Sequence, residues 1–514
     1  MRRPQLISKG TVNRLLQTAD EARSRGDFQG VVEALERASR LDPANIALLL
    51  HLGHAYGSYF DYAAAERAFD RAIRIAPNKA EVLSMAGMRA RDFGNNAMAG
   101  SYFRCALEQK DVSAETIIAL AEISERQSRL AEAAELADRA MRLKPNFPAA
   151  LLVQARLKRQ KGQLDEAEKI LLSFPSDATR DLQVRAHYER GSILDRLGRY
   201  DDAMAAFVAA KALLASNASP HLEKARQVRN QLNELRNALN PEILKRWHEF
   251  RSELQPHYRL ALLCGHPRSG TTLLEQVLDS HPGIVSAEET NIFHDTAYPP
   301  LTRNAPMNAT VLSVLESASA GALREARASY FRAVEKFLGN PIGDRLLIDK
   351  NPILTFLIAP FVRIFPEAKL LVALRDPRDV CLSCFMQPLP LNQSAAAYLT
   401  LEGTVDDYVA LMEMYQTLSP RLLNDHVEVR YEDMVDDLES VSRKVLEFLG
   451  EGWDERVLRF DEHARQKLVR SPTYADVTKP VFKRAVGRWH HYQKYFEPYL
   501  AKLAPFAKAF GYEV

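Results

Sequence analysis

Residues 258–272 read Tyr-Arg-Leu-Ala-Leu-Leu-Cys-Gly-His-Pro-Arg-Ser-Gly-Thr-Thr. The first seven residues form a short apolar run, which is typical of a buried parallel strand. Two glycines, Gly265 and Gly270, follow as turn residues, and apolar residues then recur at helical spacing over residues 273–278. Strand, glycine turn and helix in this order are the context in which a phosphate-binding loop forms. The stretch therefore predicts a P-loop-like α/β domain with a parallel sheet.

The loop offers a phosphate both charge and hydrogen-bond donors. Its glycines let the backbone bend and expose successive N–H groups, and two threonines add hydroxyls at the positive end of the following helix. A Walker A loop would carry lysine at the position of Thr271, so the sequence disfavours a kinase or a nucleoside triphosphatase. For the loop alone, an ordinary strand-to-helix turn remains the alternative. The residues expected to bind phosphate are Arg268, Ser269, Gly270, Thr271 and Thr272.

Two further strings, Asp279-Ser-His-Pro282 and Ala287-Glu-Glu-Thr290, follow the loop. With Pro-Arg-Ser-Gly-Thr-Thr-Leu-Leu at residues 267–274, they resemble the 5′-phosphosulfate loop of sulfotransferases that use 3′-phosphoadenylyl sulfate (PAPS). The resemblance is to the tyrosylprotein sulfotransferase branch and to bacterial sulfotransferases with tetratricopeptide repeats (TPR), and it spans roughly residues 258–500. In that branch the second glutamate of Glu-Glu-Thr is the catalytic base, which implies this role for Glu289. A surface or helix-capping acid is the alternative for Glu289.

A second apolar run, Ala368-Lys-Leu-Leu-Val-Ala-Leu374, predicts another buried strand that ends at Arg375. It resembles the family's 3′-phosphate site, in which an arginine that ends the strand and a serine eight residues later hold the phosphate. Arg375 and Ser383 have that spacing, and arginine makes a bidentate, permanently charged contact with phosphate. Because a 3′-phosphate distinguishes PAPS from ATP, the resemblance implies PAPS as co-substrate. Gln387 stands where a family relative has a further arginine.

Two shorter segments carry further residues that the resemblance assigns. Lys350 follows a predicted strand in Leu347-Ile-Asp-Lys-Asn-Pro352. In the family this lysine contacts the transferring sulfuryl group and stabilises the charge that develops on the departing phosphate. Tyr431 ends the predicted strand over residues 427–431, and the corresponding tyrosine lies near the adenine.

Residues 471–489 resemble the C-terminal loop that closes over the 3′-phosphate in the family. Lys479 and Arg488 would add positive charge there, although a solvated Lys479 remains the alternative. Ser471 or Thr473 would fill the position of the catalytic serine, and the sequence leaves open which of them does. Every residue assigned to the donor lies after residue 260, so the donor site is expected to be self-contained.

The resemblance also implies a mechanism. Glu289 takes the proton of an acceptor hydroxyl, whose oxygen attacks the sulfur in line, and adenosine 3′,5′-bisphosphate (PAP) leaves. The loop and Lys350 stabilise the charge that grows on the 5′-phosphate. The family needs no metal for this chemistry, and the sequence shows no cluster of metal ligands. The acceptor stays open among protein tyrosine, which the Glu-Glu-Thr string favours, a glycan, a lipid and a small phenol.

The first 215 residues repeat with a period of 34 residues. Pro43, Pro77 and Pro145 lie on one grid, and residues 46–79 match the TPR pattern at every signature position except the initial tryptophan. One helical hairpin cannot bury its own face, so the units are expected to stack into an all-α solenoid. The sequence leaves open whether this array is a scaffold or a groove that binds an acceptor or partner peptide.

We predict three segments on this basis: TPR-like repeats over residues 12–217, linking helices over residues 218–257, and a sulfotransferase domain over residues 258–514. The fold class is therefore an N-terminal all-α solenoid followed by an α/β domain. Two other functions remain open. A P-loop kinase with a TPR domain is disfavoured by Thr271, and a TPR adaptor with an inactive domain is disfavoured by the joint presence of Arg268, Glu289, Lys350, Arg375 and Ser383.

Composition narrows the class of protein further. The 514 residues are 46% apolar and 26% charged, with a net charge of +2, so no global basic surface predicts binding to nucleic acid or to a membrane surface. No run reaches the ~18 apolar residues of a membrane span, and the N-terminus lacks the apolar core of a secretory signal, which predicts a cytoplasmic protein. Four cysteines in a chain of this length predict reduced thiols, with Cys381 and Cys384 interpreted as apolar residues of a helix.

Overall fold

The structure is a computed structural model that describes residues 3–24, 26–302, 305–306, 309–389, 391–466, 477–479 and 481–513. The chain divides into two compact units. One comprises Met1–Leu157 together with Phe331–Asn340, and the other comprises Lys158–Tyr330 together with Pro341–Val514. The last repeat helices thus belong to the same unit as the sheet.

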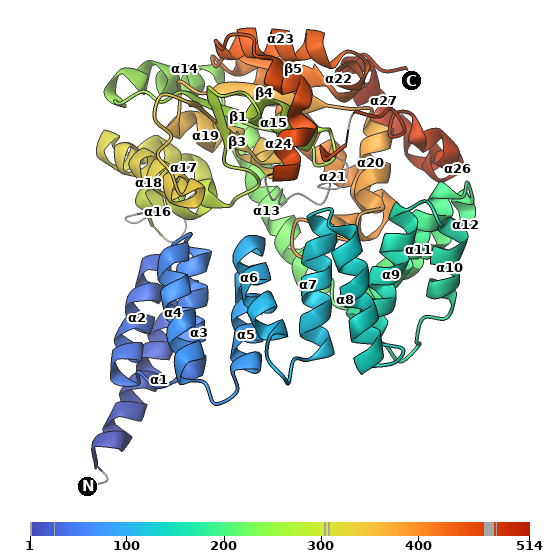
Figure 1. The fold of residues 1–514 in the computed structure, drawn as a ribbon. Helices are drawn as coiled ribbons and strands as arrows, with labels where there is room; N and C mark the ends of the chain where they lie inside the picture. The colour runs from blue at the N-terminus through green and yellow to red at the C-terminus, as the bar shows by residue number, and fades with distance from the viewer. Residues whose placement is uncertain are drawn as a thin grey trace. The chain divides into compact units, whose positions relative to one another are not determined.

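The first unit is an array of antiparallel helical hairpins (Figure 1). Buried alanines, leucines and phenylalanines form its core, as in a TPR solenoid. The hairpins are α1 (Arg3–Ser24) with α2 (Phe28–Leu41), α3 (Ile46–Ser58) with α4 (Tyr62–Ile75), α5 (Lys79–Asp92) with α6 (Asn96–Leu107), and α7 (Ala114–Arg126) with α8 (Leu130–Leu143), after which α9 (Pro148–Gln160) begins the next hairpin.

Glycine is required where the helices of a hairpin cross. A Cβ added to Gly53 would lie 2.3 Å from the ring of Phe69, which is completely buried. A Cβ on Gly87 would meet Phe103 at 2.5 Å, and one on Gly191 would meet Phe207 at 2.6 Å. The same pair of residues therefore recurs at the same place in three repeats, which is the contact that the TPR pattern of the sequence predicts.

The second unit begins with the remaining repeat helices, α10 (Leu164–Leu172), α11 (Arg180–Arg196) and α12 (Tyr200–Ala215). Two further helices, α13 (Ser219–Ala238) and α14 (Pro241–Glu249), lead into the sheet. The strands are β1 (Leu260–Gly265), β2 (Ile284–Ser286), β3 (Leu346–Lys350), β4 (Lys369–Leu374) and β5 (His426–Arg430). They lie in the order β2-β3-β1-β4-β5, and all neighbouring strands are parallel.

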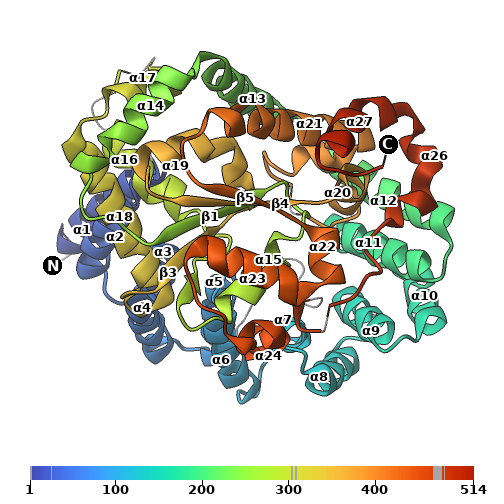
Figure 2. The same ribbon diagram turned by 90° about the horizontal axis from the view of Figure 1, so that it is seen from above.

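Helices cover both faces of the sheet (Figure 2). On one face lie α15 (Thr271–Asp279), α22 (Tyr431–Asp436), α23 (Leu438–Leu449) and α24 (Phe460–Gln466), and on the other lie α19 (Ile358–Ile364) and α21 (Leu401–Leu418). Every residue of β1 is buried, as expected for a parallel strand covered on both sides. The predicted fold class, a helical repeat array followed by an α/β domain with a parallel sheet, is confirmed.

The connections of the sheet indicate the edge at which a ligand is expected to bind. β1 is central, and the chain builds β2 and β3 on one side of it before it crosses to β4 and β5 on the other. Ligands of open α/β sheets bind at the carboxyl ends of the strands where the strand order reverses. That point is the loop between β1 and α15, flanked by the ends of β3 and β4. Among the described residues, no helix is both long and apolar enough to cross a membrane.

Candidate active site

The loop from β1 to α15 bends at two glycines. Gly265 has a φ of +130°, and a Cβ there would lie 2.3 Å from the carbonyl oxygen of Ala373 on β4. Gly270 has a φ of +92°, and its Cβ would meet the ring of Tyr431 at 2.6 Å. The Thr355 hydroxyl donates to the Gly265 carbonyl and accepts from the Gly265 N–H, both at 2.8 Å. The loop is therefore held close to β4 in a conformation that favours glycine.

We expect Gly265→Ala to destabilise the second unit by at least about 2 kcal/mol, because it adds a steric overlap with backbone to an unfavourable φ. Gly343→Ala is the matched control, since Gly343 also has a positive φ, +62°, but a Cβ there would meet open space. Gly343→Ala should lower the free energy of unfolding by about 1 kcal/mol. Denaturant unfolding of both variants measures the difference. Equal costs would show that the close approach to Ala373 does not require glycine.

Four of the predicted donor residues meet at this loop. The Nε of Arg268 donates to the hydroxyl of Ser383 at 3.0 Å, and Ser383 lies on α20 (Pro377–Phe385). The Nη1 of Arg375 donates to the carbonyl of Arg268 at 3.2 Å. The guanidinium of Arg375 also stacks on Tyr431, 4.9 Å from the ring centre. Arg268 of the predicted 5′-phosphate site and Arg375 and Ser383 of the predicted 3′-phosphate site thus form one contiguous cluster.

The Arg375 side chain is buried but not saturated with hydrogen bonds. Only 7% of the residue is exposed, and its Nε–H has no acceptor among the described residues. The nearest carboxylate, that of Asp379, lies 3.8 Å from Nη2. A buried donor without a partner is costly, and an anion bound at this point would supply the missing acceptor. The residues present therefore fit a phosphate group.

Asp379 anchors the C-terminal segment beside Arg375, a role the sequence did not reveal. Its carboxylate accepts from the N–H of Gly487 at 2.7 Å and from that of Trp489 at 2.8 Å. Burial raises the pKa of Asp379, and the nearby Arg375 partly opposes the shift. In the sequence, Asp379 is simply an acidic residue in the first turn of a helix. Such residues are common because they stabilise the helix N-terminus, so its position does not indicate this role.

The residues predicted on the C-terminal loop have different environments. The guanidinium of Arg488 pairs with Asp195 of α11, with Nη2 and Oδ2 2.6 Å apart. A phosphate contact by Arg488 would therefore require it to leave this pair. Lys479 is exposed. Ser471 and Thr473 lie outside the described residues.

The predicted catalytic pair is in direct contact. Lys350 ends β3, is only 1% exposed, and places its Nζ 2.6 Å from Oε1 of Glu289. The same Nζ lies 3.0 Å from Oε2 of Glu275, a buried residue of α15 that sequence reasoning missed. The hydroxyl of Ser286 donates to the other oxygen of Glu275. Burial alone lowers the pKa of Lys350, but the two carboxylates outweigh it and raise that pKa, so the amine is charged.

The two glutamates of the Glu-Glu-Thr string differ in accessibility. Glu288 is 5% exposed and has a φ of +52°, whereas the side chain of Glu289 is 33% exposed. The segment is fixed against the end of β3, because the N–H of Ala287 donates to Ile348 and the amide of Asn351 donates to the Thr290 carbonyl. Glu289 is thus the more accessible of the two carboxylates.

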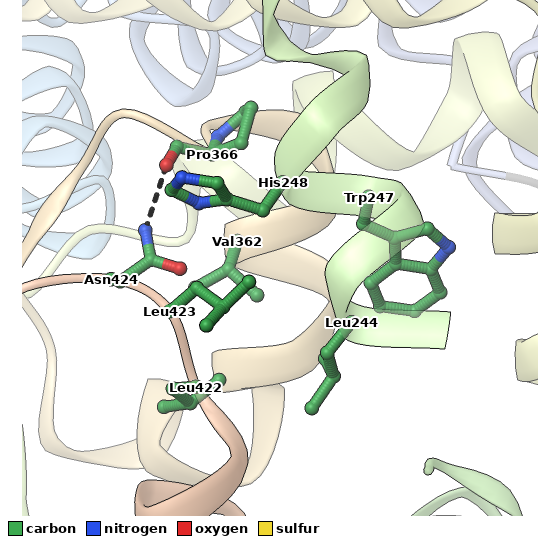
Figure 3. Close-up of a pocket in the computed structure, with 8 residues that line it drawn as sticks. All are labelled: Leu244, Trp247, His248, Val362, Pro366, Leu422, Leu423 and Asn424. Carbon is green, nitrogen blue, oxygen red and sulfur yellow. Dashed lines mark hydrogen bonds between the residues drawn. The ribbon is translucent and has the colours of Figure 1, made fainter. Parts of the chain in front are cut away.

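Two further features lie apart from this chemistry. A small pocket between α14, α19 and the loop before β5 is lined by Leu244, Trp247, His248, Val362, Pro366, Leu422, Leu423 and Asn424 (Figure 3). It adjoins the amino ends of β4 and β5, the opposite edge of the sheet from the phosphate loop. Cys381 and Cys384 are unpaired and buried, and burial raises the pKa of both thiols. Within the described part of the chain, no group of His, Cys, Asp or Glu side chains is placed to hold a metal ion.

Comparisons with known proteins identify the same two kinds of segment in the chain. Residues 261–455 match the model of the sulfotransferase family, and residues 46–79, 126–190 and 184–213 match models of the tetratricopeptide repeat. Protein-tyrosine sulfotransferase 1 of Danio rerio is 25% identical over 239 residues, which cover 45% of this chain and 65% of that protein. An uncharacterized protein of Aquifex aeolicus is 22% identical over 362 residues, which cover 68% of this chain and 45% of that protein.

Among solved structures, the sulfotransferase domain of the Synechococcus PCC 7002 olefin synthase is 21% identical, with a TM-score of 0.34. The match covers 51% of this chain and 97% of that domain. The chain spans only part of the two curated relatives named above: 65% of the Danio rerio protein and 45% of the Aquifex aeolicus protein.

Proposed function

Because the chain joins tetratricopeptide repeats to a domain of the sulfotransferase family, we propose that it transfers the sulfuryl group of PAPS to a hydroxyl acceptor. The observation that carries the proposal is the meeting of three strand ends. The loop after β1, Lys350 at the end of β3 and Arg375 directly after β4 lie at the same edge of the sheet, and Arg375 contacts the loop. The cations and loop amides at this edge suit a nucleotide with two phosphate groups.

The donor would be held from two sides. Arg268, Ser269, Gly270, Thr271 and Thr272 would bind the 5′-phosphosulfate through loop amides, hydroxyls and one guanidinium. Arg375 and Ser383 would hold the 3′-phosphate, and the exposed Lys479 would approach it from the C-terminal segment. Tyr431 packs on both Gly270 and Arg375, so it would flank the adenosine between the two phosphate sites.

The chemistry would follow from the Lys350–Glu289 pair. Bound PAPS supplies an activated sulfuryl group. Glu289 would take the proton of the acceptor hydroxyl while the acceptor oxygen forms its bond to sulfur and the bond from sulfur to the 5′-phosphate oxygen breaks. The amine of Lys350 would leave Glu289 and turn toward the developing negative charge. Its contact with Glu275 would be kept during this change. The products are a sulfated acceptor and PAP.

Protein tyrosine is the acceptor that we favour. The matching relatives include protein-tyrosine sulfotransferases of a fish, an insect and a bird. The repeat array would then contribute an acceptor- or partner-binding surface, since a solenoid offers the extended surface that a peptide needs. Incubation with radiolabelled PAPS and a panel of tyrosine peptides, glycans, lipids and phenols tests the proposal. Transfer to tyrosine peptides supports it, and failure to label any acceptor or to release PAP contradicts it.

We expect the protein to bind PAP more tightly than AMP, and Arg375→Ala to remove most of this preference. Loss of a charge-assisted contact to the 3′-phosphate should weaken PAP binding roughly 10- to 100-fold, or about 1.5–3 kcal/mol. Calorimetry with both nucleotides measures the effect. Arg443→Ala is the control, because Arg443 is half exposed on α23 and pairs with Glu439. Equal affinity of the unmodified protein for PAP and AMP, or preferential binding of ATP, would contradict the assignment.

A further inference from the structure

His266 follows Gly265 in the phosphate loop and is completely buried, yet the proposed mechanism gives it no role. Its ring centre lies 5.0 Å from that of Tyr408 on α21 and 6.4 Å from that of Tyr398 on the short helix η4 (Ala396–Leu399). Burial lowers the pKa of His266 to about 4, so the imidazole is neutral near pH 7. A polar ring in such surroundings is costly unless it makes hydrogen bonds, so its contacts indicate what it contributes.

Only one nitrogen of the ring has a strong hydrogen bond. Nδ1 lies 2.8 Å from the carbonyl oxygen of Pro267, the next residue of the loop. A carbonyl oxygen can only accept, so Nδ1 carries the proton and donates. Nε2 has no hydrogen-bond partner among the described residues. The carboxylate of Asp407 lies 3.8 Å from Nε2, too far for a hydrogen bond, and pairs with Arg229 of α13. The ring therefore contributes through Nδ1.

This contact sets the orientation of the peptide group between Pro267 and Arg268. The thiol of Cys384 on α20 also donates to the Pro267 carbonyl, at 3.5 Å, but a thiol is a weak donor. The peptide bond is trans, and in a planar trans peptide the C=O and the N–H point in opposite directions. Because the carbonyl is turned toward the buried ring, the N–H of Arg268 points away from it.

The backbone around this peptide group has the conformation of an anion-binding loop. Arg268 has a φ of +74° and Gly270 a φ of +92°, both in the left-handed region. Left-handed residues within such a turn direct backbone N–H groups to one side, where they form a concavity that binds anions. This conformation is unfavourable for a residue with a side chain, so Arg268 needs support from its neighbours.

His266 supplies that support with both its side chain and its main chain. Its imidazole holds the Pro267 carbonyl, and its own carbonyl accepts from the N–H of Ser269 at 3.1 Å. Arg268 lies between these two contacts. The turn at Arg268 is thus closed from both ends by the same residue.

We propose that His266 is a positioning residue of the donor site. By holding the Pro267 carbonyl, its Nδ1–H turns the N–H of Arg268 toward the 5′-phosphosulfate. The inference rests on the proposed function and deepens it: Arg268 meets the donor with its backbone N–H as well as with its guanidinium. His266 touches no reacting atom and acts only through the loop.

Three substitutions of His266 separate the Nδ1 donor from the bulk of the ring. Asparagine carries its amide nitrogen at the same number of bonds from the backbone as Nδ1, so His266→Asn can keep the donor. Glutamine places its amide one bond further out, and leucine has no donor, so His266→Gln and His266→Leu lose this contact. Leucine also removes the unpaired Nε2, which favours folding of that variant.

Calorimetry on the full-length chain compares PAP with adenosine 3′-phosphate, which lacks the 5′-phosphate. The 5′-phosphate of PAP stands in for the phosphosulfate of PAPS. We expect His266→Leu and His266→Gln to weaken PAP binding roughly 10- to 100-fold and binding of adenosine 3′-phosphate less than about threefold, because only PAP reaches the loop N–H. His266→Asn should keep most of the affinity for PAP.

His281→Leu is the matched control, because His281 is also a buried imidazole with hydrogen bonds to the backbone. Its Nε2 donates to the carbonyl of Gly452 at 3.0 Å, and its Nδ1 accepts from the N–H of Gly283 at 3.1 Å. It follows the last turn of α15, at the end away from the loop. His281→Leu should lower the melting temperature and leave the ratio of the two affinities unchanged.

Three results would overturn the inference and leave the proposed function standing: unchanged PAP binding by His266→Leu, equal weakening of both nucleotides, or a loss in His266→Asn as large as in His266→Leu. If His266→Leu did not fold, the comparison of His266→Asn with His266→Gln would decide. Equal affinity of the unmodified protein for PAP and adenosine 3′-phosphate would contradict a 5′-phosphate site and with it the proposed function.

Discussion

Glu289→Gln is expected to lose nearly all sulfuryl transfer while it keeps the fold and the affinity for PAP. The substitution preserves the size of the side chain and removes the group that accepts the proton of the acceptor hydroxyl. Loss of a general base typically lowers the rate by about 10²–10⁴-fold. The side chain is one-third exposed and its Oε1 contacts Lys350, so an amide oxygen can keep one hydrogen bond to that amine. Single-turnover transfer from radiolabelled PAPS measures the loss, and calorimetry with PAP measures binding.

Glu288→Gln is the matched control, because it makes the same chemical change one residue earlier. Glu288 is buried and lies in the left-handed region of φ, so we expect this variant to lose some stability and to keep most of its transfer rate. A Glu289→Gln enzyme with near-normal turnover would show that Glu289 is not the base. Loss of transfer in Glu288→Gln alone would move that role to Glu288.

The sequence was most informative where residues close in the chain act together. The strand, the glycine turn and the helix over residues 258–279 are local, and the parallel sheet brings the ends of β1, β3 and β4 to one edge. Lys350 ends β3 and Arg375 directly follows β4, so their position at this edge follows from the topology alone. The contact of Arg268 with Ser383 is also an expected result of two neighbouring strand ends.

Contacts between residues distant in the sequence could not be predicted. Glu275 lies on the buried face of α15. Its position in the sequence pattern does not distinguish it from any other residue of a helix, and only the fold brings it to Lys350. Two other contacts are of the same kind. Asp379 accepts a hydrogen bond from Gly487, more than 100 residues away, and Lys211 of α12 contacts the ring of Phe385 on α20. Propensity and periodicity describe single elements, so they carry no information about which buried charges meet.

Lys350→Met is expected to have two separate effects. Transfer should fall by about 10²–10³-fold, because the cation that stabilises the departing phosphate is lost. Stability should also fall by about 3–5 kcal/mol, since Glu275 would remain buried without its ion-pair partner. Thermal unfolding and transfer assays carried out well below the melting temperature measure the two effects independently.

The double variant Lys350→Met/Glu275→Gln separates catalysis from stability. It removes both members of the buried pair, so no uncompensated charge remains and much of the lost stability should return. Transfer should stay as low as in Lys350→Met, because the catalytic cation is still absent. Glu275→Gln alone keeps Lys350 paired with Glu289 and should lower the rate much less. If the double variant regained transfer together with stability, the loss in Lys350→Met would have come from misfolding, and Lys350 would have no direct part in the reaction.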